Sequence, residues 1–570
     1  MSERDSTTRV RAIPRCRLGR AESLVRRGLI DGSSTIISGA TVYDGSAAMP
    51  VTSDVLIRGE QILAVEPDIA RTGAVVVDGR SLAVAPGFID MHSHADFTLP
   101  AYPAAHNSLS QGVTTEVLGN CGWSPAPLSA TNLDHRERWQ KVARALGPDL
   151  SWAWTTFAEY LSHLDGAHAA VNSAVLVGHS AIRSATYGID DRPPTPAELA
   201  SMRQLLDEAL TAGAWGMSTG LVYPPSSFAQ ADEIEALAAD VSSRGALYST
   251  HMRDEGDELV TAVQEAIDVS RRTGVRVQIS HLKAAGPRSH GTIRAALDMI
   301  DAARETRLKV GCDAYPYLAG STVLTQLVPA WAMVGGVAEL LNRLRSEEMR
   351  ERIRAEIRQS PSAYVTRAGG WSQVMICRVE NEALRRFEGR FLPEIAGDLG
   401  KTEADVLFDL LLDDLARTTM IVFLMDETDV ETVLDHPSTV VGSDQLGVHS
   451  ATARVHPRAY GTFARAIARA ARGDEASLST AIAKATGRTA SRLGLPDRGF
   501  VRPGHVADLV IFDPQTIADV ATYENPTKSA VGIDSVFLAG RAAIAGGEVV
   551  DASLGRVLRR GHRPVPAGKN

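Results

Sequence analysis

The sequence is poor in cysteine and has no secretory leader pattern. Its 570 residues include four widely spaced cysteines: Cys16, Cys121, Cys312 and Cys377. This spacing argues against a disulfide framework and favours a reducing compartment, so we expect a cytoplasmic protein. The first thirty residues are rich in arginine but contain no apolar segment, which is not the pattern of a secretory signal. We therefore expect residues 1–33 to form a disordered basic tail.

The sequence also lacks an excess of positive charge and any long apolar run. The formal net charge is -9 at pH 7, and no basic patch is interleaved with aromatic residues, which argues against a nucleic-acid partner. The longest uncharged stretch, 314–338, carries Pro316, Pro329 and several glycines. We interpret it as a loop and pocket wall rather than a membrane span, so we expect no membrane partner. The sequence leaves open whether the protein forms a homo-oligomer.

The body of the chain alternates apolar runs with helical patterns. The apolar runs are Ala83–Met91, Val113–Leu118, Ser173–Val177, Ala214–Ser218, Ala246–Ser249, Val275–Ser280, Leu308–Cys312 and Ser438–Gly442. Helix-like segments such as Pro196–Ala212 and Glu258–Thr273 lie between them, a pattern typical of βα units around a parallel sheet. We therefore predict an α/β fold built on a (β/α)8 TIM barrel, whose chemistry sits at the C-terminal ends of the strands. An all-parallel open sheet is the structural alternative.

Short β patterns flank this body at both ends of the chain, over residues 34–84 and 488–560. We expect them to form one small β-sandwich domain built from both termini, with the TIM-barrel catalytic domain, 85–487, inserted into it. The gap between the seventh and eighth apolar runs is far longer than an ordinary βα loop. It predicts an insertion over roughly 322–419, with helices near Glu347–Gln359 and Glu403–Arg417.

Residue types that bind metals follow five of the apolar runs. They are His92 and His94, Cys121, His251, His281 and Asp444. On a strand, the two histidines of the first run would point the same way. Each residue alone has an ordinary explanation, since Cys121 could be a buried apolar thiol and Asp444 a helix N-cap. Because strand ends meet at one face of a barrel, their joint placement predicts a shared metal site.

Imidazole and thiolate ligands suit zinc. Six ligands exceed what one tetrahedral ion needs, so we expect a binuclear site with Cys121 as the bridge. A bound metal lowers the pKa of water to about 7, which makes hydroxide available at neutral pH. A carboxylate beside that water, Asp444, can take its proton and pass it to a leaving amine. The expected reaction is the metal-assisted hydrolysis of a carbonyl compound.

These features resemble the amidohydrolase superfamily, and within it the N-acyl-D-amino-acid deacylases, or D-aminoacylases. The matching stretches run from residue 36 to about 513 and include PGFIDMHSHAD, GVTTEVLGNCGWSPAP, THMRDE, ISHLK and HPRAYGTF. Many relatives use a carboxylated lysine near the end of strand four, whereas GMSTGLVYPP has no lysine here and Cys121 stands in the deacylase position. The resemblance implies zinc-dependent hydrolysis of N-acyl-D-amino acids to a carboxylate and a D-amino acid. Hydrolysis of a cyclic amide, carbamate or dipeptide is the alternative, followed by a non-catalytic barrel scaffold.

The resemblance also assigns the metal-binding residues to two sites. The tighter zinc would bind Cys121, His251 and His281. His92, His94 and Asp444 would define a second site that is weaker or empty, with Asp444 as the general acid and base.

A small anionic substrate would be bound by further residues that the resemblance implies. Its carboxylate would contact Lys283, Arg458 and Tyr223, while Tyr315 and Ser321 would form the wall of the pocket. A lysine together with an arginine fork is the arrangement that a carboxylate favours. The alternative for Lys283 and Arg458 is ordinary surface charge.

Two further residues near the strand ends complete these expectations. His179 follows the third apolar run, and we interpret it as a structural residue or a support for a ligand. Gln445 stands where the family usually has a glycine after the strand-eight aspartate. Because a glycine there would free the backbone, we expect Gln445 to reshape the pocket.

Overall fold

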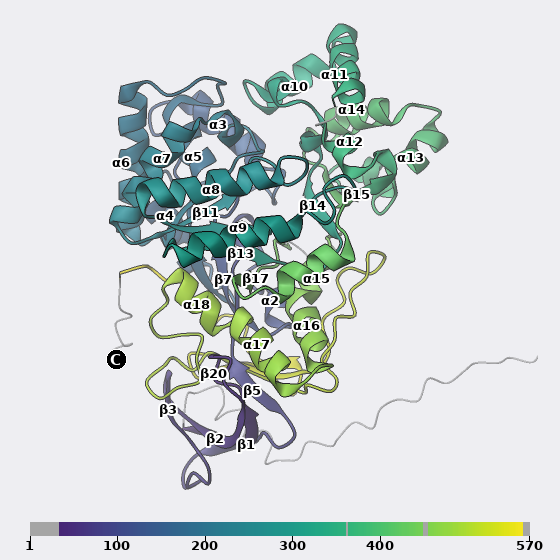
Figure 1. The fold of residues 1–570 in the computed structure, drawn as a ribbon. Helices are drawn as coiled ribbons and strands as arrows, with labels where there is room; N and C mark the ends of the chain where they lie inside the picture. The colour runs from purple at the N-terminus through teal and green to yellow at the C-terminus, as the bar shows by residue number, and fades with distance from the viewer. Residues whose placement is uncertain (1–33, 361–362, 449–453, 562–570) are drawn as a thin grey trace, which may run out of the picture.

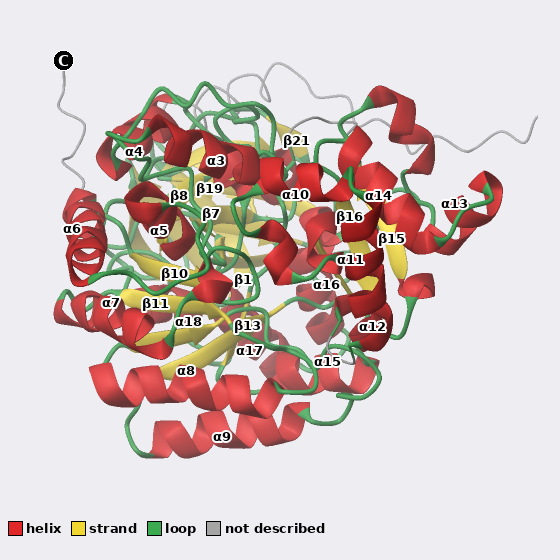
Figure 2. Ribbon diagram, turned by 90° about the horizontal axis from the view of Figure 1, so that it is seen from above, coloured by secondary structure: helices red, strands yellow, loops and turns green. Residues whose placement is uncertain are grey.

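The structure is a computed structural model that describes residues 34–360, 363–448 and 454–561 (Figure 1). The expected basic tail at residues 1–33 lies outside the described residues. The described chain combines helices with four β-sheets, and the helices lie around the strands when the molecule is seen from above (Figure 2). Among the described residues, no helix combines the length and the apolar character that crossing a bilayer requires.

Parallel strands form two of the four sheets and correspond to the predicted apolar runs. The three-stranded sheet has the order β6-β7-β8, and the six-stranded sheet has the order β17-β13-β12-β11-β10-β9, with every neighbouring pair parallel. The strands are β6 (Phe88–Asp90), β7 (Val113–Leu118), β8 (Asn172–Val175), β9 (Val177–Gly178), β10 (Gly216–Gly220), β11 (Leu247–His251), β12 (Arg276–Ile279), β13 (Val310–Ala314) and β17 (Thr439–Val441).

The two parallel sheets are linked at both of their edges. Strand β9 follows β8 after a single residue. At the other edge, the backbone N–H of Met91 donates to the carbonyl of Val441 over 3.2 Å. The backbone N–H of Asp444 likewise donates to the carbonyl of His92 over 2.7 Å. The C-terminal ends of β6 and β17 therefore lie side by side.

The first predicted strand, Ala83–Met91, is in fact two strands that belong to different sheets. The run breaks at Gly87, so that β5 (Ala83–Pro86) joins the nine-stranded sheet and β6 joins the parallel strands. A Cβ atom at Gly87 would lie 2.3 Å from the side chain of Thr114, which leaves room for glycine alone. Both halves of the run are fully buried. Apolar periodicity cannot separate two such halves, because neither half alternates with polar residues.

The nine-stranded sheet pairs strands from both ends of the chain. Its order is β21-β20-β19-β18-β5-β1-β2-β3, with β4 paired to β1. The sheet contains β1 (Thr35–Val42), β2 (Val51–Arg58), β3 (Gln61–Glu66), β4 (Val75–Asp78), β18 (Leu509–Phe512), β19 (Ile533–Leu538), β20 (Arg541–Ala545) and β21 (Glu548–Val549). Apolar side chains from both ends, including Ile37, Val55, Leu509 and Phe537, pack into one core.

The region between β13 and β17 contains its own sheet and helices. Antiparallel strands β14 (Ala319–Val323), β16 (Thr419–Phe423) and β15 (Val374–Arg378) pair in that order. The helices are α10 (Val337–Leu344), α11 (Glu347–Gln359), α12 (Tyr364–Ala368), α13 (Leu392–Leu399) and α14 (Glu403–Asp413). The predicted helix at Glu347–Gln359 is confirmed, and the second one ends at Asp413, earlier than expected. Ser346 and Thr402 cap α11 and α14 by accepting backbone N–H bonds.

Helices surround the parallel strands (Figure 2), and some of them pack directly on a strand, as α8 does on β12. The helices are α2 (His106–Leu109), α3 (Leu133–Ala143), α4 (Phe157–Gly166), α5 (His179–Tyr187), α6 (Pro196–Ala212), α7 (Ala231–Ser243), α8 (Leu259–Thr273), α9 (Ile293–Glu305), α15 (Glu427–Asp435), α16 (Arg458–Ala471), α17 (Glu475–Ala485) and α18 (Gly487–Leu493). Helix α8 buries Leu259, Ala262, Val263, Ala266 and Ile267, which is helical spacing. Helix α6 begins with a capping box at Thr195 and a proline in its first turn.

Candidate metal centre and substrate cavity

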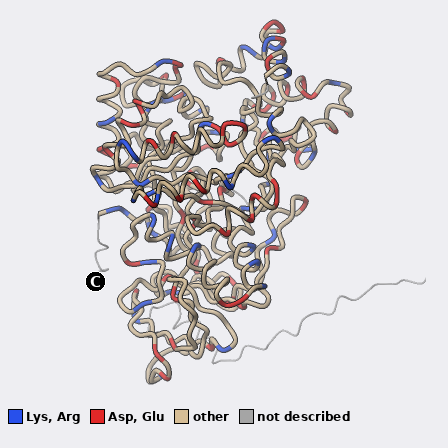
Figure 3. Tube along the Cα trace, viewed as in Figure 1, with Lys and Arg blue, Asp and Glu red and all other residues tan. Residues whose placement is uncertain are grey.

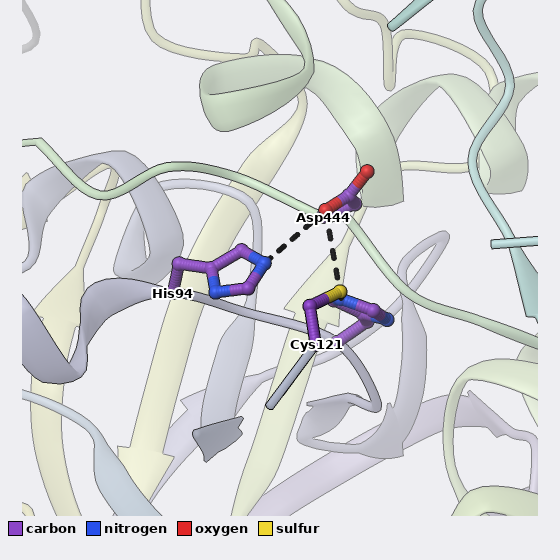
Figure 4. A group of neighbouring side chains, drawn as sticks. His94, Cys121 and Asp444 are labelled. Carbon is purple, nitrogen blue, oxygen red and sulfur yellow. Dashed lines mark hydrogen bonds and ion pairs between the residues drawn. The ribbon is translucent and has the colours of Figure 1, made fainter. Parts of the chain in front are cut away.

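The residues predicted at the strand ends meet around the thiol of Cys121. Its Sγ lies 3.3 Å from Nε2 of His92 and 3.4 Å from Nε2 of His281. The ligand atoms of His92, His94, Cys121 and Asp444 all lie within 4.8 Å of one another, as do those of Cys121, His251 and His281. Figure 4 shows the His94 ring directed at the Asp444 carboxylate. The structure therefore brings together all six predicted metal-binding residues, which we call the metal cluster, and Cys121 belongs to both groups.

Three residues of the metal cluster have an unusual backbone conformation. The φ angles of Cys121, His281 and Asp444 are 52°, 36° and 52°, in the left-handed region that non-glycine residues rarely adopt. Each of the three lies two or three residues after the end of a strand. Such strain costs about 1–3 kcal/mol per residue and persists only where the surroundings impose it. Here the N–H of His281 is held by Asp313 Oδ1 at 2.8 Å.

Charge within the metal cluster favours the ionised forms of the sulfur and the carboxylate. Burial raises the pKa of Cys121, but the charges of His92 and His281 outweigh it and hold that pKa well below its usual value. Burial likewise raises the pKa of Asp444, and Arg458 and His281 bring it well below the ordinary carboxyl value. The thiolate is the form of cysteine that binds metals. Both anionic donors are therefore ready to receive a cation.

The hydrogen bonding of the histidines also fits a metal ion. The rings of His92 and His281 have centroids 4.9 Å apart, and those of His251 and His281 are 4.3 Å apart. Within the described chain, the buried Nδ1 atoms of His94 and His251 have no hydrogen-bond partner. Nε2 of His92 and Nε2 of His281 both lie against the same thiolate, an arrangement that a bound cation would stabilise. Nitrogen, sulfur and carboxylate donors in this combination suit zinc.

Two carboxylates that the sequence reasoning missed hold the histidines in place. Asp313 Oδ1 lies 3.2 Å from Nδ1 of His92. Glu255 Oε1 lies 2.8 Å from Nδ1 of His281. A carboxylate behind a metal-binding histidine fixes the orientation of its ring and makes it a better ligand. Both residues lie at the C-terminal ends of parallel strands, in β13 and just after β11, and this position was the available signal.

The two predicted substrate cations are buried beside the metal cluster. Lys283 Nζ lies 2.6 Å from Oε1 of Glu255. Arg458 Nη1 lies 2.9 Å from Oδ2 of Asp444, and its guanidinium stacks 4.6 Å from the ring centroid of Tyr315. Both side chains are therefore held by carboxylates of the site, which excludes ordinary surface charge as their explanation.

A cavity of about 60 Å³ opens onto the metal cluster. Its lining includes His94, His251, His281, Asp444, Tyr223, Glu255, Lys283, Tyr315, Ser321, Thr322, Tyr364 and Arg367. The buried hydroxyl of Tyr315 has no hydrogen-bond partner among the described residues, so it is available to a ligand. The hydroxyl of Tyr223 pairs with Thr322 Oγ1 at 2.9 Å, and Ser321 Oγ donates to the Met420 carbonyl at 2.9 Å. Arg458 is not part of this lining, but it contacts Tyr315, Asp444 and the carbonyl of Ser321, which are part of it.

Gln445 does not shape the cavity in the way that we expected. Its side chain is buried, and its Nε2 donates to Glu116 Oε1 at 3.2 Å and to Ser108 Oγ at 3.1 Å. Its Oε1 accepts from Asn107 Nδ2 at 2.7 Å, while its backbone carbonyl accepts the N–H of His94 at 2.9 Å. Because these polar partners lie behind the strand ends, the side chain is drawn away from the cavity and supports the segment that carries His94.

Comparison with known proteins adds an independent line of observation. A model of the amidohydrolase family, Amidohydro_3, matches residues 75–550. An N-acyl-D-aspartate deacylase of Alcaligenes xylosoxydans xylosoxydans is 38% identical over 92% of this chain and 95% of that protein. A D-aminoacylase of the same organism is 37% identical over 92% of this chain and 97% of that protein. The fold is also similar to the crystal structure of an N-acyl-D-glutamate deacylase from Bordetella bronchiseptica, complexed with zinc and a phosphonate inhibitor. The two structures match with a TM-score of 0.78 and 33% identity, over 92% of this chain and 99% of that chain.

Proposed function

This chain belongs to the amidohydrolase family, and from that premise we propose that it hydrolyses the amide bond of N-acyl-D-amino acids, releasing a carboxylate and a D-amino acid. The observation that carries the proposal is the convergence of both groups of the metal cluster on Cys121 beside one small cavity. The related proteins of similar length are an N-acyl-D-aspartate deacylase and a D-aminoacylase, which supports the same reaction class.

We infer that the two parallel sheets close into one eight-stranded barrel, with β8 and β9 as one interrupted strand. The backbone hydrogen bonds from Met91 to Val441 and from Asp444 to His92 support closure between β6 and β17. In this proposal the barrel domain spans 85–487, with an insertion at about 322–419. Residues 34–84 and 488–560 form the β-sandwich domain.

We propose zinc as the metal, with Cys121, His251 and His281 at the tighter site and His92, His94 and Asp444 at a second, weaker one. When bound, zinc would polarise the amide carbonyl and lower the pKa of water. The mixture of nitrogen, sulfur and oxygen donors supports this choice. The zinc complex of the related N-acyl-D-glutamate deacylase agrees with it.

Asp444 is the residue that moves the proton. Its carboxylate lines the cavity and is kept ionised by the ion pair with Arg458. In the ionised form it accepts the proton of the attacking water and then delivers that proton to the amide nitrogen as the C–N bond breaks. Arg458 positions the carboxylate by holding Oδ2, which leaves Oδ1 directed at His92 and His94.

The cavity suits a small anionic substrate. Lys283 lies in its wall with Glu255, and the free hydroxyl of Tyr315 offers a donor to the substrate carboxylate. Tyr223 and Ser321 shape the same wall and are already hydrogen-bonded to the inserted region. Because Thr322, Tyr364 and Arg367 come from that region, it covers the cavity and limits the entry of water, as lids do.

The proposal is tested with purified, zinc-loaded protein and a panel of matched substrates. The panel contains the N-acetyl-D and N-acetyl-L forms of methionine, aspartate and glutamate, together with cyclic imides. We expect release of the D-amino acid at a rate at least about 100-fold above that of its L form, because stereoisomers place the amide differently against Asp444. Faster turnover of a cyclic imide, or stoichiometric zinc without hydrolysis of any D substrate, would overturn the proposal.

A further inference from the structure

A second cavity lies at the N-terminal ends of β12, β13 and β17, whereas the metal cluster lies at the opposite, C-terminal ends. Its volume is about 1050 Å³. The described residues that line it include no aspartate or glutamate, but they include six cationic side chains: Arg276, Arg304, Lys309, Arg488, Arg492 and Arg502. We call this space the basic cavity. Figure 3 shows several blue stretches in the part of the trace where Figure 1 labels α18.

The cations of the basic cavity are held mainly by neutral partners. Arg276 donates to the carbonyl of Arg492 at 2.6 Å, and Arg304 donates to the carbonyl of Val310 at 3.0 Å. Arg492 donates to Gln278 Oε1 at 2.9 Å. In the part of the chain that the structure describes, Arg502 is the one member with a carboxylate at ion-pair distance, Asp44 Oδ2 at 3.2 Å. The positive charge of the other five is therefore not neutralised by a carboxylate.

Burial and, after it, repulsion between like charges lower the pKa values of two of these side chains. Burial lowers the pKa of Arg492 to about 9, and the like charges of Arg276 and Arg304 add to the effect. The pKa of Arg488 is also lowered by burial and by Arg304. The whole chain carries a net charge of -9, so a concentration of uncompensated cations here is a local feature. An anion of matching size would relieve this repulsion.

We propose that the basic cavity is a binding site for a small polyanion that carries a chain of phosphate groups. Guanidinium groups present paired donors that match the oxygens of phosphate. The cavity is concave and large enough for several phosphates, and the arginines approach it from α9, α18, the start of β12 and the segment before β18. The two sources of this chemistry are a free polyphosphate and the phosphate chain of a nucleotide.

Isothermal titration of the full-length, zinc-loaded protein tests the site with sodium tripolyphosphate and with ATP, each at constant ionic strength. We expect saturable binding of one molecule per chain. A nucleotide site would bind ATP at least about tenfold more tightly than tripolyphosphate, which is about 1.4 kcal/mol, whereas a free-polyphosphate site would not. Zinc content is measured after each titration, so that removal of zinc by the phosphates is separated from binding.

A charge-matched pair of variants makes the experiment decisive. The double variant Arg304→Gln with Lys309→Gln removes two exposed cations of the basic cavity, and we expect it to weaken binding at least about tenfold. The control, Arg385→Gln with Arg386→Gln, removes two exposed cations from the inserted region and should leave the affinity within about twofold. The proposal would be overturned if both double variants weakened the binding of the probes equally. It would also be overturned if neither probe showed saturable binding. If the first double variant is unstable, Arg488→Gln replaces it in the same comparison.

Discussion

Two buried clusters in this molecule combine histidine with a carboxylate, and they differ in what their polar atoms contact. In the first, the His179 cluster, Nε2 of His179 lies 2.9 Å from Glu233 Oε1, and Nδ1 lies 2.7 Å from Ser226 Oγ. Arg183 Nη1 lies 2.6 Å from the other oxygen of Glu233. Both ring nitrogens of this histidine are therefore paired within the protein.

The metal cluster has the opposite character. The Nδ1 atoms of His94 and His251 have no partner in the described chain, three of its residues have positive φ, and it faces a cavity. The difference teaches that a buried histidine beside a carboxylate does not by itself indicate a metal site. Several potential metal ligands within 4.8 Å of one another, beside a cavity, do indicate one. The backbone links the two clusters, because the N–H of Ser180, next to His179, donates to the carbonyl of Gly122, next to Cys121. The His179 cluster thus supports the loop that carries the thiol.

The substitution with the largest expected effect, Asp444→Asn, tests the chemistry of the metal cluster. The amide keeps the shape but cannot accept a proton, so turnover should fall by about 10²–10⁴-fold. The tighter zinc should remain, since Cys121, His251 and His281 are intact. Steady-state rates together with metal analysis check this. The matched control is Asp435→Asn, an exposed carboxylate that pairs with Arg469, and it should leave turnover unchanged. Near-normal turnover of the Asp444 variant would exclude the role.

Glu233→Gln is the corresponding change in the His179 cluster, and it should affect stability instead of chemistry. Glu233 is almost fully buried, and the substitution leaves the guanidinium of Arg183 without its counter-charge. Removing one partner of a buried pair costs about 3–5 kcal/mol. The midpoint of urea unfolding should therefore fall, while zinc content per folded molecule stays the same. Loss of zinc at unchanged stability would contradict this division of roles.

The pH dependence of the same variant sharpens the result. Burial raises the pKa of Glu233, but hydrogen bonds and charges from His179 and Arg183 outweigh it and hold the pKa below its ordinary value. A carboxyl whose folded pKa is lowered stabilises the protein above its unfolded pKa, near 4.5, and loses that contribution as pH falls. The difference in the free energy of unfolding between wild type and Glu233→Gln should therefore become smaller below about pH 4.5. If this difference in the free energy of unfolding stayed constant down to pH 3, the charge of Glu233 would not be the cause of the destabilisation.

Asp313→Asn is expected to have an intermediate effect, on the affinity for zinc. Asp313 contacts Nδ1 of His92 and the N–H of His281, and it accepts from Gln278 Nε2 at 2.8 Å. Loss of a carboxylate that orients a metal-binding histidine typically costs about 10–100-fold in metal affinity. Competition with a chelator of known affinity measures this. The smaller effect of Gln278→Leu serves as a reference, since Gln278 binds Asp313 and Arg492 and reaches the metal cluster through Asp313.

The sequence was sufficient to predict which residues come together in the metal cluster, because their positions at strand ends follow from the periodicity of the chain. An apolar run marks a strand, and the residue after it lies at a known end of that strand, which is how Cys121 and Asp444 were predicted. Pairing between side chains does not follow from periodicity. Lys283 was expected to face a substrate, and only the fold reveals its contact with Glu255, 28 residues away. The break at Gly87 was missed for a related reason, since it depends on Thr114 in a neighbouring strand.

Gln445→Gly, the substitution with the smallest expected effect, separates scaffold from pocket. Glycine removes the contacts with Glu116, Ser108 and Asn107, but it keeps the backbone carbonyl that accepts the N–H of His94. Water can enter the polar space that the side chain leaves, so stability should fall by only about 1 kcal/mol. Turnover of each D substrate should change by less than about threefold, because the side chain does not contact the cavity. A change in the order of preferred substrates would instead place Gln445 among the residues that select the side chain.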